Sequence, residues 1–106
     1  MFTRSVSVHL KPNTATEFTR TIENEIIPLL RKQKGFQNEI TLVAPGGLTA
    51  IGISFWDQKE NAEAYGRTTY PEVQKVLAKV VEGTPQVQTY EVCNSTFPKV
   101  AARAAA

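Results

Sequence analysis

Apolar and polar side chains alternate along the first stretch of the chain. The apolar positions are Val6, Val8 and Leu10, and the polar positions between them are Ser5, Ser7 and His9. A period of two is typical of a β-strand with one buried face. The pattern predicts a first strand over residues 4–10, which the following Pro12 and Asn13 end.

The next stretch changes to helical spacing. Its apolar stripe consists of Ala15, Phe18, Ile22, Ile26, Leu29 and Leu30. This spacing predicts an amphipathic helix. Thr14 and Glu17 are three residues apart, which fits a capping box at the helix start, and Gly35 suits the C-terminal cap. Pro28 removes one helix hydrogen bond, so we expect a kink there without an end to the helix.

The second half of the chain repeats both patterns. Strands are predicted over residues 36–43 and 48–55, with the turn Pro45-Gly46-Gly47 between them. A short helix capped by Asp57 and Glu60 is expected to run to Tyr65 and to be interrupted at Gly66. A second helix then begins near Pro71. Its stripe is Val73, Val76, Leu77, Val80 and Val81, and a last strand follows over residues 86–96.

This order of elements is the α+β, ferredoxin-like βαββαβ arrangement, a four-stranded antiparallel sheet with two helices on one face. We expect a single domain over residues 1–97 and an Ala-rich C-terminal tail over residues 98–106. In the third strand the bulky set is assigned to the helix side and the small set to the uncovered face. The bulky set is Ile51, Ile53 and Phe55, and the small set is Ala50, Gly52 and Ser54.

A sheet covered on one side leaves its other face to water or to a partner. A homodimer is therefore predicted, in which two sheets close into a shared α+β barrel.

Composition excludes several partners. The chain is 42% hydrophobic and 21% charged, as in ordinary soluble proteins, and its net charge is only +2. The Lys and Arg residues are scattered, so nucleic acid is not an expected partner. No apolar run is long enough for a signal peptide or a membrane span, and no membrane partner is expected. With a single cysteine, a cytoplasmic protein without disulfides is predicted.

Metal and cofactor chemistry has few residues to use. The only His and the only Cys, His9 and Cys93, lie far apart in the sequence, and the acidic residues are dispersed. Zinc sites use three or four N and S ligands, and hard cations use clustered carboxylates, so no metal and no cofactor are expected. Cys93 is interpreted as a small buried filler on the last strand.

Three motifs resemble those of the antibiotic-biosynthesis-monooxygenase superfamily of dimeric α+β barrels. They are Phe18 with Pro28-Leu29-Leu30, then Lys34-Gly35-Phe36, and then Phe55-Trp56-Asp57. The resemblance covers about residues 2–97. It implies a dimeric barrel, and the family includes cofactor-independent monooxygenases that oxidise polycyclic aromatics, haem-degrading enzymes and small isomerases.

The haem-degrading branch of that superfamily is not expected. It is marked by an Asn in the first strand, a Trp nine residues after the third-strand Trp and a haem-ligating His ten residues further. Here Ser5 and Ser7 occupy the first strand, Tyr65 occupies the Trp position and Lys75 occupies the His position.

Two candidate site residues have open alternatives. His9 is the only side chain whose unperturbed pKa lies near neutrality, so it is the natural general base for a phenolic substrate; alternatively it is a surface or interface histidine. Trp56 is either a wall of an aromatic-binding pocket or a plug of the barrel end.

Tyr65, Arg67 and Tyr70 surround the expected helix break at Gly66. Two phenols and a guanidinium suit an oxygenated ring, which they would hold by hydrogen bonds and stacking. The alternative is a surface break with two half-buried tyrosines.

Three functions remain open. The first is a cofactor-independent monooxygenase acting on a small or polycyclic aromatic of the quinol type, with His9 as base and Trp56, Tyr65, Arg67 and Tyr70 binding substrate. The second is a non-catalytic ligand-binding or stress-related dimeric barrel. The third is an isomerase or cyclase on the same scaffold.

Overall fold

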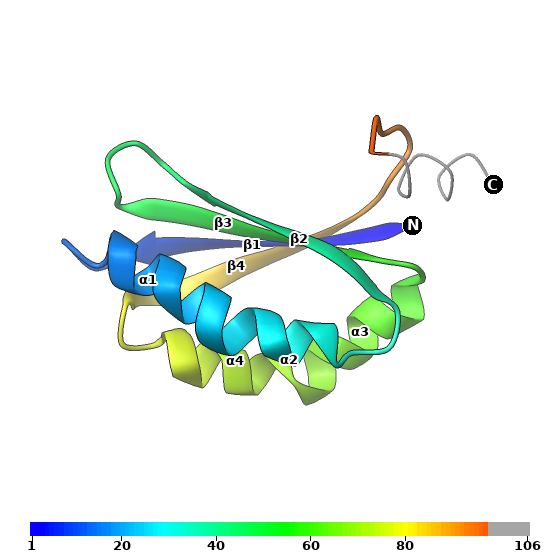
Figure 1. Ribbon diagram of the computed structural model, residues 1–106, viewed down its shortest axis with the longest axis horizontal. Helices are drawn as coiled ribbons and strands as arrows, with labels where there is room; N and C mark the ends of the chain where they lie inside the picture. The colour runs from blue at the N-terminus through cyan, green and yellow to red at the C-terminus, as the bar shows by residue number, and fades with distance from the viewer. Residues whose placement is uncertain (98–106) are drawn as a thin grey trace.

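Four antiparallel strands form one sheet, and the helices lie together on one of its faces (Figure 1). The strands are β1 (Phe2–Leu10), β2 (Phe36–Val43), β3 (Thr49–Trp56) and β4 (Val81–Glu91), in the order β2-β3-β1-β4. This computed structural model describes residues 1–97, and the Ala-rich tail expected over residues 98–106 lies outside them. The predicted ferredoxin-like α+β arrangement is confirmed.

The first helical segment continues through Pro28, as predicted. It consists of α1 (Ala15–Thr21), a π-helical turn η1 (Ile22–Ile26) and α2 (Ile27–Arg31). In η1 the N–H of Ile27 donates to the carbonyl of Ile22, five residues back. A proline clashes with the carbonyl four residues before it, and a wider turn relieves that clash. The buried stripe is Phe18, Ile22, Ile26 and Leu30.

The two predicted side-chain caps do not form. The Thr14 hydroxyl donates to the Lys11 carbonyl at 2.6 Å, within the preceding turn. The Asp57 carboxylate accepts from the side-chain amide of Asn61 at 2.8 Å, and the helix begins after Gln58. Short polar side chains that can cap a helix also bond to neighbouring turns, and here those bonds prevail.

The second helical segment breaks later than predicted. It comprises α3 (Lys59–Thr68) and α4 (Tyr70–Leu77), and α3 passes through Gly66. One glycine costs a helix only about 1 kcal/mol. The break falls at Thr69 because Pro71, near the start of α4, cannot donate to the end of α3.

The last strand begins five residues earlier than predicted. Val80 and Val81 have helical spacing, but α4 ends at Leu77 and Val81 pairs with Leu10. Because β4 is an edge strand, it tolerates Pro85 within its length. Cys93 lies beyond β4 and is exposed, so its interpretation as a buried filler is wrong.

The face assignment of β3 is also wrong. Val6 of β1 lies opposite Gly52, and Val8 lies opposite Ala50. Directly opposed residues share a face, so the small set faces the helices and the bulky set faces away. We call the uncovered side the open face; its apolar side chains are Ile40, Leu42, Ile51, Ile53, Phe55 and Tyr90.

Within residues 1–97 the structure has no helix of sufficient length and apolar character to cross a membrane.

Gly35 joins α2 to β2 in a conformation that only glycine adopts easily. Its φ is +81°, and an added Cβ would overlap the Asp57 carboxylate and lie 2.5 Å from the amide nitrogen of Asn61. We expect Gly35→Ala to lower the free energy of unfolding by at least about 1–2 kcal/mol, the usual cost of left-handed backbone. Urea unfolding followed by the fluorescence of the single, fully buried Trp56 measures this.

Gly46→Ala is the matched control. Apart from Gly46 and its two chain neighbours, no atom of residues 1–97 lies within 4 Å of a Cβ added at Gly46, and its φ is not left-handed. Equal unfolding midpoints for the two variants would contradict the role assigned to Gly35.

Candidate functional site

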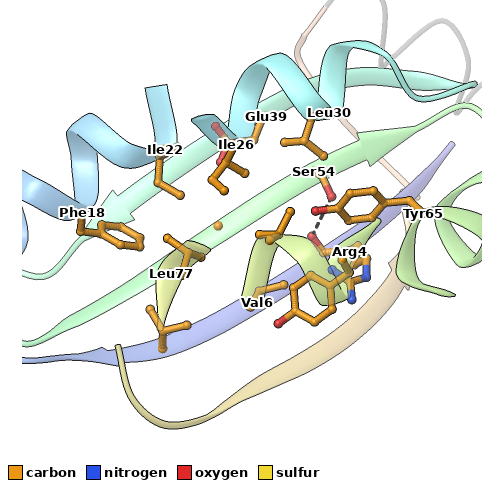
Figure 2. Close-up of a pocket in the computed structure, with 14 residues that line it drawn as sticks. Arg4, Val6, Phe18, Ile22, Ile26, Leu30, Glu39, Ser54, Tyr65 and Leu77 are labelled. Atoms are coloured by element: carbon orange, nitrogen blue, oxygen red, sulfur yellow. Dashed lines mark hydrogen bonds between the residues drawn. The ribbon is translucent and has the colours of Figure 1, made fainter. Parts of the chain in front are cut away.

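A cavity of about 60 Å³ lies between the helices and the covered face of the sheet (Figure 2). One wall is aliphatic and aromatic, and the strands together with α3 and α4 add a few polar groups. The apolar lining is Val6, Val8, Phe18, Ile22, Ile26, Leu30, Gly52, Val73 and Leu77. The polar lining is Arg4, Glu39, Ser54, Tyr65 and Tyr70. An apolar hollow with a few convergent polar groups is the usual form of a small-molecule site.

Arg4 brings a buried positive charge to this cavity. It has the same strand parity as Val6 and Val8, so its side chain lies on the helix side, and it is 7% exposed. Its guanidinium carbon lies 4.0 Å from the ring centroid of Tyr70 and 5.3 Å from that of Tyr65. Both distances fit cation–π contacts.

No acidic side chain among residues 1–97 pairs with Arg4, because the ion pairs found there involve other residues. Burial lowers the pKa of Arg4, and the two tyrosines oppose that shift. A guanidinium stays protonated at neutral pH even so. The cavity therefore holds a cation that lacks an anionic partner within the described part of the chain.

Two phenols lie around this cation. The hydroxyl of Tyr70 is buried and has no hydrogen-bond partner within residues 1–97. Burial raises the pKa of Tyr70, and it raises the pKa of Tyr65 to about 12. Both phenols are therefore neutral at physiological pH, and the Tyr70 hydroxyl is available as a donor.

Glu39 brings a carboxylate from β2 to the same cavity. Burial raises the pKa of Glu39, while the Thr41 hydroxyl donates to its Oε2 at 2.6 Å and opposes the shift. The space next to the Glu39 carboxylate is open because Gly52 of β3 has no side chain; a Cβ at Gly52 would lie 3.8 Å from Oε2 of Glu39. A carboxylate with a raised pKa in a cavity is suited to accept a proton.

Trp56 packs against Tyr65, one of the residues that line the cavity. It is fully buried, and its ring centroid lies 5.2 Å from that of Tyr65 and 5.7 Å from that of Phe36. Its indole N–H donates to the Ser54 hydroxyl at 2.9 Å. Trp56 does not line the cavity, so its contacts match the packing alternative.

His9 and Arg67 also lie outside the cavity, and both are exposed. His9 has the opposite strand parity to Arg4, so it projects toward the open face. Arg67 follows Tyr65 by two residues in an unbroken helix, which turns it away from the buried side of α3. Of the five candidate residues, the structure brings Tyr65 and Tyr70 together at the cavity.

Arg4, Glu39 and Ser54 are not among the site residues predicted from the sequence. Arg4 could have been found from its position in the alternating pattern. It lies two residues before Val6 and four before Val8, so its side chain shares their buried face of the strand. Glu39 and Ser54 lie opposite each other in the β2–β3 pairing, which the misassigned faces of β3 concealed.

No group of three or more His, Cys, Asp or Glu side chains is placed to hold a metal ion in the part of the chain that the structure describes.

Comparison with known proteins finds similarity in structure. No family model matches the sequence, and no curated protein matches it. A monooxygenase from the gene ActVA-Orf6 of Streptomyces coelicolor, solved with the ligand nanaomycin D, superposes with a TM-score of 0.76. It is 14% identical, and the alignment covers 92% of this chain and 91% of that one.

Two further solved structures are similar to the same degree. A candidate antibiotic biosynthesis monooxygenase from Bordetella bronchiseptica has a TM-score of 0.73 at 14% identity, covering 86% of this chain and 95% of that one. A protein of unknown function from Nitrosomonas europaea has a TM-score of 0.74 at 13% identity, covering 92% and 93%. The resemblance predicted from the sequence motifs is confirmed at the level of the fold: the chain has the fold of the antibiotic biosynthesis monooxygenase-like proteins.

Proposed function

We propose that this protein binds an oxygenated aromatic molecule of the quinol type in the cavity and oxidises it with molecular oxygen, without a cofactor. The observation that carries the proposal is the buried guanidinium of Arg4, which has no acidic partner within residues 1–97 and lines a mostly apolar hollow. The unpartnered hydroxyl of Tyr70 beside it supports the same ligand class. The fold shared with a monooxygenase that was solved with nanaomycin D supports the reaction class.

Three of the polar groups have a role in this reaction. The phenolate oxygen of the substrate pairs with Arg4 and accepts a hydrogen bond from Tyr70, while the aliphatic wall holds the ring. Glu39 takes the proton, since it is the carboxylate that lines the cavity. Ionisation in a site of low dielectric is favoured by a fixed cation more strongly than in water.

The ionised substrate is then electron-rich enough to reduce oxygen directly. In the net reaction a ring carbon that carries two hydrogens in the keto tautomer becomes a carbonyl. One oxygen atom enters that carbonyl, and the other leaves as water with the two hydrogens. Atoms and electrons balance between substrate and oxygen, so the protein has only to bind, orient and move a proton.

A non-catalytic binding protein is the second candidate. The observation that favours it is the position of His9, the only histidine in the sequence, which is exposed and lies outside the cavity. Proton transfer must then depend on Glu39 alone.

The proposed site belongs to a homodimer formed through the open face. Leu42 is 49% exposed there and Ile51 is 37% exposed, while Ser5 and Ser7 of β1 are small enough to allow close approach. Contiguous apolar surface of this kind on a soluble domain usually marks an interface. Two such sheets packed face to face would form the α+β barrel.

Replacing the proposed base gives the first test of activity. Glu39→Gln keeps the shape of the side chain but accepts no proton, so we expect oxygen consumption with a panel of hydroquinones and anthrones to fall by about 10² or more. Ligand binding is expected to persist. Glu23→Gln, an exposed carboxylate of η1, is the matched control and should keep full activity.

Three outcomes decide between the candidates. Full activity of Glu39→Gln would contradict the assignment of Glu39 as the base. Loss of activity in the variant His9→Ala would contradict it as well. Binding of the panel by the wild-type protein without oxygen consumption would favour the non-catalytic alternative.

The pH profile provides a separate prediction. Burial raises the pKa of Glu39 above its ordinary value of 4.5, and the base works only when it is ionised. As the pH falls, activity should therefore be lost at a higher pH than an exposed glutamate would give. A profile of kcat/KM with no acid limb above pH 4.5 would exclude Glu39 as the base.

The dimer is tested by placing a charge on the open face. We expect the wild-type protein to sediment as a dimer at micromolar concentration and Ile51→Lys to sediment as a monomer, because burying an unpaired ammonium costs several kcal/mol. Thr16→Lys, on the exposed surface of α1, is the control and should remain dimeric. A monomeric wild-type protein in analytical ultracentrifugation would overturn this part of the proposal.

A further inference from the structure

A second hollow adjoins the cavity of the candidate site. It lies between α4 and β4, measures about 240 Å³ and is lined by Gln74, Ala78, Val81, Gly83, Thr84 and Pro85 together with four residues of the first cavity. We call the first hollow the inner cavity and this one the outer groove. The outer groove is about four times larger than the inner cavity.

The four shared residues form the wall between the two hollows. They are Val6, Val8, Tyr70 and Leu77. Val6 is paired with both neighbouring strands, Val8 is paired with β3, and Leu77 is a buried aliphatic side chain. Tyr70 is the one aromatic member, and it is the first residue of α4, directly after the helix junction at Thr69.

The buried Tyr70 ring is held by two specific contacts, with Arg4 and with Tyr65. Its hydroxyl makes no hydrogen bond within residues 1–97, so a change of rotamer breaks none there. The ring would give up its packing against Tyr65, at a centroid distance of 6.3 Å, and its stack on Arg4, at 4.0 Å from the guanidinium carbon. A cation–π contact contributes about 0.5–2 kcal/mol. An anionic ligand on Arg4 replaces that contact with a stronger one.

The size of the inner cavity makes such a movement necessary for large ligands. An engineered cavity that binds benzene measures about 150 Å³. The inner cavity, at about 60 Å³, therefore requires some adjustment even for one ring. A molecule with three fused rings fits only if the wall opens into the outer groove.

We propose that Tyr70 sets the number of rings in the ligand by separating the inner cavity from the outer groove. With the ring stacked on Arg4, the site takes a single-ring phenol. With the ring displaced, the two hollows join, and a fused-ring phenol places its ionised oxygen at Arg4 and its remaining rings in the outer groove along Ala78 and Pro85. The inference relies on the proposed function for the ligand position at Arg4, and it is independent of oxidation.

The experiment compares two phenolic ligands under anaerobic conditions by isothermal titration calorimetry. Hydroquinone supplies one ring, and 1,8-dihydroxyanthraquinone supplies three. In Tyr70→Ala we expect the affinity for the three-ring ligand to rise by about tenfold or more relative to hydroquinone. Val73→Ala is the matched control, because Val73 lines the inner cavity but not the outer groove. It should leave the ratio of the two affinities nearly unchanged.

A second variant fills the outer groove without touching the core. Ala78 is exposed at the end of α4, so Ala78→Phe is compatible with folding even if Tyr70→Ala is not. We expect it to weaken binding of the three-ring ligand by about tenfold and to leave hydroquinone binding unchanged. An equal effect of Ala78→Phe on both ligands, or equal affinity ratios in Tyr70→Ala and Val73→Ala, would overturn the proposal.

Failure of the proposed function is distinguishable from failure of this inference. If the protein consumes no oxygen but the affinity ratio still shifts in Tyr70→Ala, then the oxidation is excluded and the size selection stands. If oxygen is consumed while the affinity ratio does not shift in Tyr70→Ala, then the oxidation stands and the size selection by Tyr70 is excluded.

Discussion

Arg4 carries a permanent positive charge into the space between the sheet and the helices, where its guanidinium stacks on Tyr70 and lies near Tyr65. Removing an ion from water costs several kcal/mol, and aromatic faces return only part of that. Helices α3 and α4 both contact this charge. The guanidinium lies against α3 at Gly66, where a Cβ would be in ordinary van der Waals contact with its nitrogens at 3.7 Å. The junction between α3 and α4 at Thr69 brings both tyrosines to the same charge.

The aromatic cluster behind the charge fixes its position. Trp56 packs against Tyr65, and its indole N–H bonds to Ser54, whose hydroxyl lies 3.4 Å from the carbonyl of Arg4. The chain thus connects the end of β3, the start of β1 and α3 through one set of buried contacts. A ligand anion would supply the partner that this set of contacts lacks, so the contacts that stabilise the fold also shape the candidate site.

The sequence predicted the topology because strands and helices had distinct periods and the turns carried Gly and Pro. It failed where one pattern fits two structures. Both sets of β3 residues are apolar or small, so hydrophobicity alone does not assign their faces. Val80 and Val81 suit a helix by spacing and a strand by β-branching, and the pairing of Val81 with Leu10 decides between them. Tyr65 and Tyr70 were found as candidates from their position near the helix break, whereas Arg4 was missed because a strand arginine is ordinarily exposed.

The orientation of β3 joins the site to the open face. Ala50, Gly52 and Ser54 face the helices, and their small volume leaves the inner cavity unfilled beneath Ile22 and Ile26. The same alternation directs Ile51, Ile53 and Phe55 to the open face, where Phe55 contacts Phe97 at a centroid distance of 6.4 Å. Because side chains along a strand alternate strictly, a slip of one residue would fill the cavity and make the open face small and polar. The cavity of the candidate site and the apolar open face are therefore two consequences of one strand register.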